Sequence, residues 1–190
     1  RGAEGIPAVD IGCGKLTMED CEIVCSSSDC IVIHGNGTDP VIRRCVIHDG
    51  RRSGVRVTDS GRGTIEECDI WGNEYPGVAI SQSGHPIISK CRIHDGKASG
   101  VLIHGNGCGT IEECDIWANA LSGIAVTTGG NPSVRNCRVH DGKEVGVRAY
   151  SGGRGTFVCC ETWGNAMRGV QVEPGGEPVF IGCTYRDKKQ

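Results

Sequence analysis

A repeat of about 23 residues runs through nearly the whole sequence, and it limits the folds open to this chain more than any other feature. Its clearest marker is a cysteine that recurs once after 24 residues and then six times after 23. These ladder cysteines are Cys21, Cys45, Cys68, Cys91, Cys114, Cys137, Cys160 and Cys183. Apolar residues stand three positions before each of them, and glycine stands nine positions after most of them. A period of this length is typical of a solenoid, in which a unit must stack on its neighbours to bury its apolar face.

Each unit has room for three short strands and for no helix. Its three apolar patches, such as Val78–Ile80, alternate in character, are separated by Gly, Asn, Asp or Pro, and are shorter than the ~10–12 residues of a helix. We therefore predict an all-β fold, a parallel β-helix solenoid of about eight 23-residue coils with three short strands per coil. Glycine, at 31 of 190 residues, is more than twice its usual share of ~7% and suits the many turns of such a fold. We expect residues 1–190 to form a single domain that is a segment of a larger protein.

A second period of 46 residues lies over the first, because two kinds of unit alternate. Three positions after the ladder cysteine, one kind carries histidine and the other tryptophan, and strand alternation turns this position outward. We call these residues the His/Trp column: His48, Trp71, His94, Trp117, His140 and Trp163. Because tryptophan combines a large apolar area with a polar group, the column is a candidate ligand-binding site for sugar rings or a peptide. The alternative is that the rings only pack on one another and shield the sheet.

Charged residues beside the ladder cysteine alternate with the same long period. Arg43–Arg44 is followed one unit later by Glu66–Glu67, and directly after the cysteine Asp69, Arg92 and Asp115 succeed one another. In a parallel stack this order places acid beside base, which favours one stacking register over the others. The first interpretation of the long period is therefore structural.

The step His-Asp-Gly occurs three times and is the most tempting catalytic signal, because a carboxylate can orient a histidine for proton transfer. Neighbouring residues on a strand face opposite sides, however, and three equivalent copies are not the pattern of one active site. The sequence therefore favours turns at Asp49, Asp95 and Asp141. The next position holds Gly50 in one kind of unit and Asn73 in the other, and because both residue types tolerate the left-handed conformation, we predict a positive φ there.

The ladder cysteines are expected to be buried free thiols. Stacked coils space them by ~4.8 Å with parallel side chains, whereas a disulfide needs Cβ atoms ~3.5–4.5 Å apart and a twisted geometry. The total of 13 cysteines is also odd. So many free thiols favour a reducing compartment, so we expect a cytoplasmic location and leave secretion open. Cys21, Cys25 and Cys30 have spacings that a metal ion can use, but Cys21 belongs to the ladder and Cys30 takes a glycine position, so we predict no metal and no cofactor.

Composition and motifs argue against several classes of partner and activity. The chain has 20 Lys+Arg and 23 Asp+Glu, a net charge of −3, and no basic run, so no nucleic-acid partner is expected. No apolar stretch approaches the ~18–20 residues of a membrane helix, so no membrane partner is expected either. Phosphate-binding loops, nucleophile elbows and zinc-protease motifs are absent. Six equal gaps also leave no long insertion in the middle units, where enzymes on repetitive scaffolds build their clefts.

One unit, Cys91-Arg-Ile-His-Asp-Gly-Lys-Ala-Ser-Gly-Val-Leu-Ile followed by Gly107-Cys-Gly-Thr-Ile-Glu-Glu-Cys114, resembles the right-handed parallel β-helix repeat proteins of the pectate-lyase-like superfamily. It is most similar to the carbohydrate-binding and sugar-hydrolase repeat group, which includes the β-helix region of F-box substrate adaptors. The resemblance extends from about Gly5 to Cys183 and implies a right-handed helix, in which cysteine takes the corner that an asparagine ladder fills in many relatives. The catalytic motifs of pectate lyases and polygalacturonases have no position here to which they can be carried over.

These observations favour a non-catalytic β-helix scaffold or binding module, with a protein, peptide or carbohydrate ligand on a sheet face and no catalytic residue assigned. The alternative is a polysaccharide-active enzyme, a lyase, epimerase or hydrolase, with its substrate along the β-helix. A spacer without any ligand is a third hypothesis. The sequence shows no capping helix at either end, and open sheet edges invite pairing, so end-to-end self-association is also expected.

Overall fold

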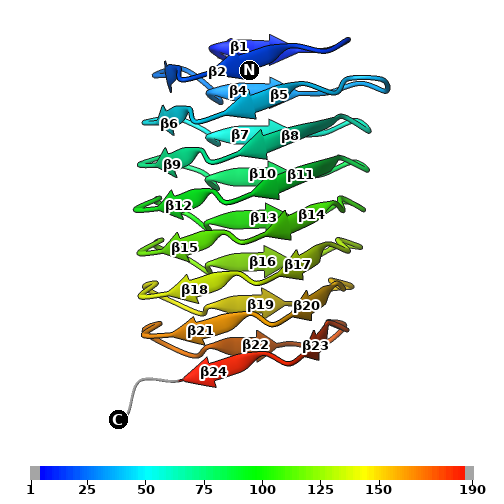
Figure 1. Ribbon diagram of the computed structural model, residues 1–190. Coiled ribbons are helices and arrows are strands. Elements are labelled where there is room, and N and C mark those ends of the chain that lie inside the picture. The colour runs from blue at the N-terminus through cyan, green and yellow to red at the C-terminus, as the bar shows by residue number, and fades with distance from the viewer. Residues whose placement is uncertain (1–4, 187–190) are drawn as a thin grey trace.

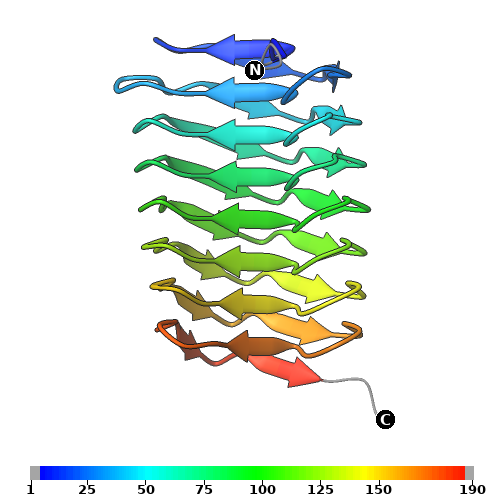
Figure 2. The ribbon, with the colours of Figure 1, turned by 180° about the vertical axis from the view of Figure 1, so that it is seen from behind.

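The computed structural model describes residues 5–186 as a rod of stacked coils, seen from two sides in Figure 1 and Figure 2. Each coil contributes one short strand to each of three parallel sheets, so every sheet contains eight strands. The described residues form strands and turns but no helix. The predicted all-β solenoid of about eight coils, with three strands per coil, is confirmed.

The three sheets run along the rod, and consecutive strands of the chain belong to different sheets. Sheet A contains β1 (Val9–Ile11), β4 (Ile31–Ile33), β7 (Val55–Val57), β10 (Val78–Ile80), β13 (Val101–Ile103), β16 (Ile124–Val126), β19 (Val147–Ala149) and β22 (Val170–Val172). Sheet B contains β2 (Thr17–Glu19), β5 (Val41–Arg43), β8 (Arg62–Glu66), β11 (His85–Ser89), β14 (Thr110–Glu112), β17 (Ser133–Arg135), β20 (Thr156–Val158) and β23 (Val179–Ile181). Sheet C contains β3 (Glu22–Val24), β6 (Val46–His48), β9 (Asp69–Trp71), β12 (Arg92–His94), β15 (Asp115–Trp117), β18 (Arg138–His140), β21 (Glu161–Trp163) and β24 (Thr184–Arg186).

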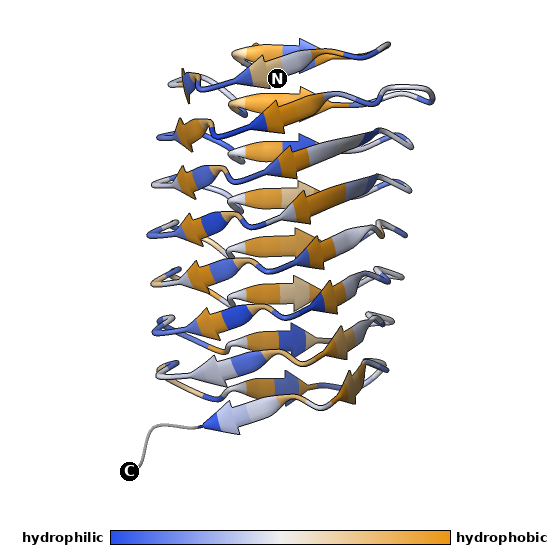
Figure 3. Cartoon of the chain, viewed as in Figure 1, coloured by the Kyte–Doolittle hydropathy of each residue, from blue (hydrophilic) through white to orange (hydrophobic). Residues whose placement is uncertain are grey.

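Equivalent residues of successive coils lie side by side, so the core consists of columns of like residues. Ile93, for example, pairs with Ile70 in the coil before and with Ile116 in the coil after, and all three side chains are fully buried. Figure 3 shows the same apolar bands recurring from strand to strand. Like side chains stacked at the strand spacing of ~4.8 Å fill the interior. Each of them packs mainly on the equivalent residues of the neighbouring coils.

The ladder cysteines occupy the corner between sheets B and C. The six from Cys45 to Cys160 are buried, and all cysteines of the described residues are free thiols, as predicted. The residue before each of these six has a positive φ between 51° and 55°, so the chain turns sharply there. The Cys91 thiol donates to the carbonyl of Ser89 at 3.3 Å and to that of Ile65 in the preceding coil at 3.4 Å. Cysteine thus suits this corner because it is small and can also donate a weak hydrogen bond.

A second corner, between sheets C and A, holds asparagine and corrects one expectation. Asn73, Asn119 and Asn165 are buried there on every second coil. The positive φ lies one residue earlier than predicted, at Asp49 in one kind of unit and at a glycine or alanine in the other. Gly50 is needed for space instead of for its φ: its N–H donates to Asn73 Oδ1 at 2.8 Å, and a Cβ there would lie 2.7 Å from the same oxygen.

The side chain of Thr162 interrupts one core column and leads to a prediction. It pairs with Val139 and Tyr185 in the inward column of sheet C, and its buried hydroxyl oxygen has no hydrogen-bond partner. Because an unpaired buried hydroxyl is costly, Thr162→Val is expected to raise the free energy of unfolding by about 1 kcal/mol. Chemical denaturation measures the change, and Thr110→Val on an outward position of β14 is the matched control, with little expected effect. A less stable Thr162→Val protein would contradict this account of the column.

The first and last coils carry exposed apolar side chains. At one end Ile6 and Leu16 are exposed, and at the other Val179, Ile181 and Tyr185 are about half exposed. End-to-end self-association stays a prediction. Within residues 5–186, no helix has the length and apolarity needed to cross a membrane.

Candidate functional site

The rings of the His/Trp column face outward on sheet C and stack on one another. Each histidine lies nearly parallel to the tryptophan one coil later, with ring centroids 4.2 Å apart for His48 and Trp71 and 4.1 Å apart for His94 and Trp117. The His140 and Trp163 rings are 4.4 Å apart in the same way. The predicted outward column is therefore present, and each histidine ring stacks nearly parallel on the tryptophan ring of the next coil.

Each histidine of the column is held between two carboxylates, which corrects the expectation that histidine and the next aspartate point apart. His94 Nδ1 lies 2.7 Å from Asp95 Oδ2, and His94 Nε2 lies 2.9 Å from Asp69 Oδ1 of the preceding coil. His48 and His140 repeat this arrangement. Strand alternation fails here because Asp95 is already in the left-handed turn, with φ 51°, so its side chain swings back to the same face.

The alternating charges beside the column pair across coils as predicted. Arg92 Nη2 lies 2.7 Å from Asp69 Oδ2, so this one carboxylate binds both Arg92 and His94 of the next coil. Arg138 and Asp115 make the same contact at 2.7 Å. Exposed ion pairs of this kind contribute only about 0–1 kcal/mol each, so their main effect is on register. Each histidine of the column thus stacks on the next tryptophan and has carboxylates at both imidazole nitrogens, and ligand binding by the column stays a prediction.

The surroundings of His48 predict a dependence of stability on pH. Partial burial lowers the pKa of His48, but hydrogen bonds to Asp49 and Glu22 outweigh this effect and raise the pKa above its ordinary value of 6.5. A raised pKa in the folded state means that protonated His48 stabilises the fold fully below about pH 6.5, and that this contribution is lost as the pH rises through the folded-state pKa. An NMR titration of the His48 ring should give a midpoint above 6.5, and a midpoint at or below it would contradict the prediction. In His48→Gln, the unfolding free energy should fall less over the same pH range.

A hollowed surface lies elsewhere, on the outer face of sheet A. Three adjoining hollows follow this face, with volumes of about 250 Å³, 280 Å³ and 490 Å³ from the N-terminal coils onward. Arg52 and Arg56 line both the first and the second hollow, and Tyr75, Pro76 and Leu102 line both the second and the third. The shared residues make the hollows one continuous depression, which we call the sheet A groove.

The floor of the sheet A groove is the outward middle residue of each strand. Consecutive floor residues are register partners, so they lie one coil apart along the rod. They are Val32, Arg56, Ala79, Leu102, Ala125 and Arg148. The walls are the turns before and after each strand, which stand higher than the floor, so that Val32, Ala79 and Ala125 are nearly covered although they point outward.

The first hollow is lined largely by polar and titratable groups. His34 Nε2 lies 2.9 Å from Asp10 Oδ1, and Thr58 and Asp59 line the same hollow. Arg56 is fixed by Asp29, whose carboxylate is buried and lies 3.1 Å from Arg56 Nη2. This end of the groove can therefore offer an imidazole, a carboxylate and guanidinium groups to a polar ligand.

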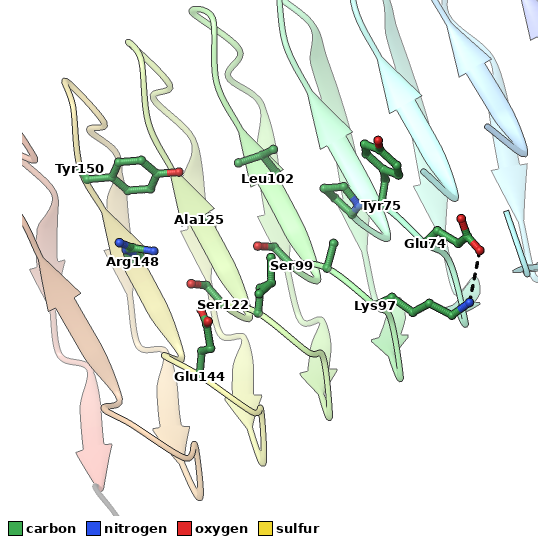
Figure 4. Close-up of a pocket in the computed structure, with 13 residues that line it drawn as sticks. Glu74, Tyr75, Lys97, Ser99, Leu102, Ser122, Ala125, Glu144, Arg148 and Tyr150 are labelled. Carbon is green, nitrogen blue, oxygen red and sulfur yellow. Dashed lines mark hydrogen bonds and ion pairs between the residues drawn. The ribbon is translucent and has the colours of Figure 1, made fainter. Parts of the chain in front are cut away.

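The third hollow is lined mainly by apolar and aromatic groups, with charges at its rim (Figure 4). Tyr75 is 57% exposed at one end, and Tyr150 lies at the other end, with the Arg148 guanidinium 4.9 Å from its ring centre. Two of the charged residues are paired: Lys97 Nζ lies 3.4 Å from Glu74 Oε1, and Arg148 Nη2 lies 2.7 Å from Glu173 Oε1. Such a lining suits a ligand with flat apolar faces and hydroxyl edges.

The residues of the sheet A groove were not among the predicted site residues. Two histidines outside the His/Trp column, His34 and His104, line the groove. The available signal was the middle residue of each triplet after the repeated glycine, which alternates between large and small residues along the chain. No group of three or more His, Cys, Asp or Glu side chains within residues 5–186 is arranged to hold a metal ion.

The sequence matches the family described as "Right handed beta helix region" over residues 8–131 and again over residues 105–190. A search among curated proteins found no match.

Three similar solved structures are polysaccharide-active enzymes or modules of such enzymes. A periplasmic alginate epimerase has a TM-score of 0.73 at 14% identity, over 90% of this chain and 43% of its own. A pectate lyase has a TM-score of 0.54 at 11% identity, over 96% of this chain and 70% of its own. The A-module of a mannuronan C-5 epimerase from Azotobacter vinelandii has a TM-score of 0.52 at 15% identity, over 90% of this chain and 59% of its own. Identities this low show a shared fold, and this chain spans less than half of the alginate epimerase.

Proposed function

The chain belongs to the right-handed β-helix family, and from this architecture we propose that it is a non-catalytic scaffold that binds an extended polysaccharide along the sheet A groove. The observation that carries the proposal is the continuity of the three hollows along one face of the rod. A groove that crosses successive coils suits a chain-like ligand that lies along the rod axis, because each coil then offers a similar contact to each unit of the ligand.

The lining of the groove supports a carbohydrate ligand over the other classes considered. Tyr75 and Tyr150 supply ring faces for the apolar side of a sugar, while Asp59, Glu144 and Arg52 supply acceptors and donors for hydroxyl groups. Acidic and basic groups are nearly balanced along the groove, so it does not select for a strongly charged polymer. The polysaccharide-active enzymes that share the fold support the same ligand class for this chain.

The binding proposal predicts that Tyr75→Ala weakens binding of an oligosaccharide by about 1–3 kcal/mol, which is the range for burial of one large apolar side chain. Isothermal titration with oligosaccharides selected on a glycan array measures this loss, and circular dichroism checks that the variant is folded. Trp117→Ala in the His/Trp column is the matched aromatic control and should leave the affinity unchanged. The opposite result, with affinity lost in Trp117→Ala and kept in Tyr75→Ala, would move the site to the column.

A second candidate function is a polysaccharide lyase, epimerase or hydrolase, and one observation favours it. His34 and Asp10 form a hydrogen-bonded pair in the first hollow, beside Arg52 and Arg56, so an acid–base group lines the proposed ligand groove. The two functions are separated by measuring turnover and binding on the same glycans. Turnover that is abolished in His34→Gln while binding persists would establish the enzyme, whereas binding without turnover supports the scaffold.

A further inference from the structure

The floor of the sheet A groove alternates between large and small residues from coil to coil. Arg56, Leu102 and Arg148 are separated by Ala79 and Ala125, and each neighbouring pair is in direct register. The two alanines therefore mark depressions two coils apart, or ~9.6 Å at a strand spacing of ~4.8 Å. Ala79 lines the second hollow and Ala125 lines the third, and the side chain of Leu102 borders both.

The depression over Ala125 has an apolar lining. Besides Leu102, this lining includes Pro76, Ala98 and Leu121, and Leu121 is 43% exposed. Lys97 and Arg148, which also line the hollow, are paired with Glu74 and Glu173, and Glu144 adds a carboxylate. The hollow has a volume of about 490 Å³, and its bottom is apolar.

An unmodified sugar fits this bottom poorly. Its edges carry hydroxyl groups, which lose water on burial and require hydrogen-bond partners that alanine, leucine and proline side chains cannot supply. A short acyl group has the opposite properties, since its methyl end gains free energy on leaving water and its ester carbonyl needs only one donor. Ser99 and Ser122 line the same wall and carry hydroxyl groups that can donate to such a carbonyl.

We propose that the depressions over Ala79 and Ala125 receive short acyl esters, such as acetyl groups, carried by the polysaccharide in the sheet A groove; this inference rests on the proposed binding function. If each sugar spans one coil, the spacing of the depressions selects a chain that is acylated on every second sugar. The known chemistry of sugar hydroxyls places such esters at the edge of the ring, where they project toward the groove floor.

The experiment compares matched ligands that differ only in their esters. Tetra- to octasaccharides of O-acetylated xylan and O-acetylated uronate polymers are used, each next to a sample whose esters have been removed by mild alkali. We expect the acetylated member of a pair to bind about five- to tenfold more tightly, since about one apolar group is buried per depression. Ala125→Leu, which fills the larger depression, should remove most of this gain, so that the acetylated and deacetylated ligands bind this variant with similar affinity. Ala166→Leu on an exposed turn outside the groove is the control.

The outcomes separate this inference from the function on which it rests. Equal binding of acetylated and deacetylated oligosaccharides would overturn the acyl site and leave polysaccharide binding standing. No binding of any glycan would overturn both. An extended peptide with apolar residues between acidic ones is the competing occupant, and its binding with loss in Ala125→Leu, in place of glycan binding, would also overturn the proposal. A gain from acetylation that persists in Ala125→Leu would place the ester elsewhere and contradict the assignment.

Discussion

Asn119→Ala is expected to lower the free energy of unfolding by about 2–5 kcal/mol, although the side chain lies in a turn and is far from both ends of the rod. The Asn119 side chain is buried, its Oδ1 accepts a hydrogen bond from the Gly96 N–H at 3.1 Å, and its Nδ2 donates to the Ile93 carbonyl at 3.1 Å. Alanine leaves both backbone groups buried without these partners, and each such group costs about 1–3 kcal/mol. Urea denaturation monitored by circular dichroism measures the loss.

The matched control for Asn119 is Asn131→Ala, because Asn131 is an exposed asparagine in a turn of the same coil region. A surface change of this kind is expected to stay within about 0.5 kcal/mol. If the two variants were equally stable, the buried asparagines would not hold the corner between sheets C and A. The alternation of glycine and asparagine there would then need another explanation.

Gly100→Ala is expected to destabilise the fold by about 3 kcal/mol or more, at the upper end of the range for an overfilled site. A Cβ on Gly100 would lie 2.6 Å from Ile116 Cγ2, 2.7 Å from the Gly123 carbonyl oxygen and 2.9 Å from Asn119 Nδ2. Two of these atoms belong to the next coil's core and backbone, so relief requires the coils to move apart. Thermal and urea unfolding both report the change.

Gly37→Ala provides the comparison for Gly100. Gly37 has a φ of +90° but no atom within 4 Å of its Cβ position, so the added methyl causes backbone strain without a clash. Its expected cost is about 1–2 kcal/mol. Equal losses in both variants would show that coil contact at Gly100 is not the reason for its glycine.

The sequence was sufficient to predict the features that depend on equal spacing. Because Ile70, Ile93 and Ile116 lie one period apart, parallel stacking alone places them together, and the same holds for the ladder cysteines. The long period likewise predicted that Asp69 and Arg92 pair across coils. In a solenoid, residues one repeat apart in the sequence lie one coil apart in space. Contacts between them can therefore be predicted without knowing the rest of the fold.

Two features were not predicted from the sequence. One depends on the geometry of a turn, and the other depends on how far neighbouring turns project beyond a sheet. The bond between His94 and Asp95 was missed because strand alternation was carried one residue too far, into a residue with positive φ. The sheet A groove was missed because it arises from tall turns on both sides of small floor residues such as Ala79 and Ala125. A single repeated position of the sequence does not show the difference in height between the floor residues and the turns beside them. That difference follows only from how the floor and the two flanking turns are placed relative to one another.

The alternation of two kinds of coil has a consequence for how such a protein can change in length. Ring type and charge return to their starting values only after 46 residues. Duplicating or deleting two coils would keep histidine next to tryptophan and acid next to base across the new junction, whereas a single coil would place like rings and like charges next to each other. The molecule is therefore built from an indivisible double unit, and evolution can extend or shorten it cheaply only in even steps.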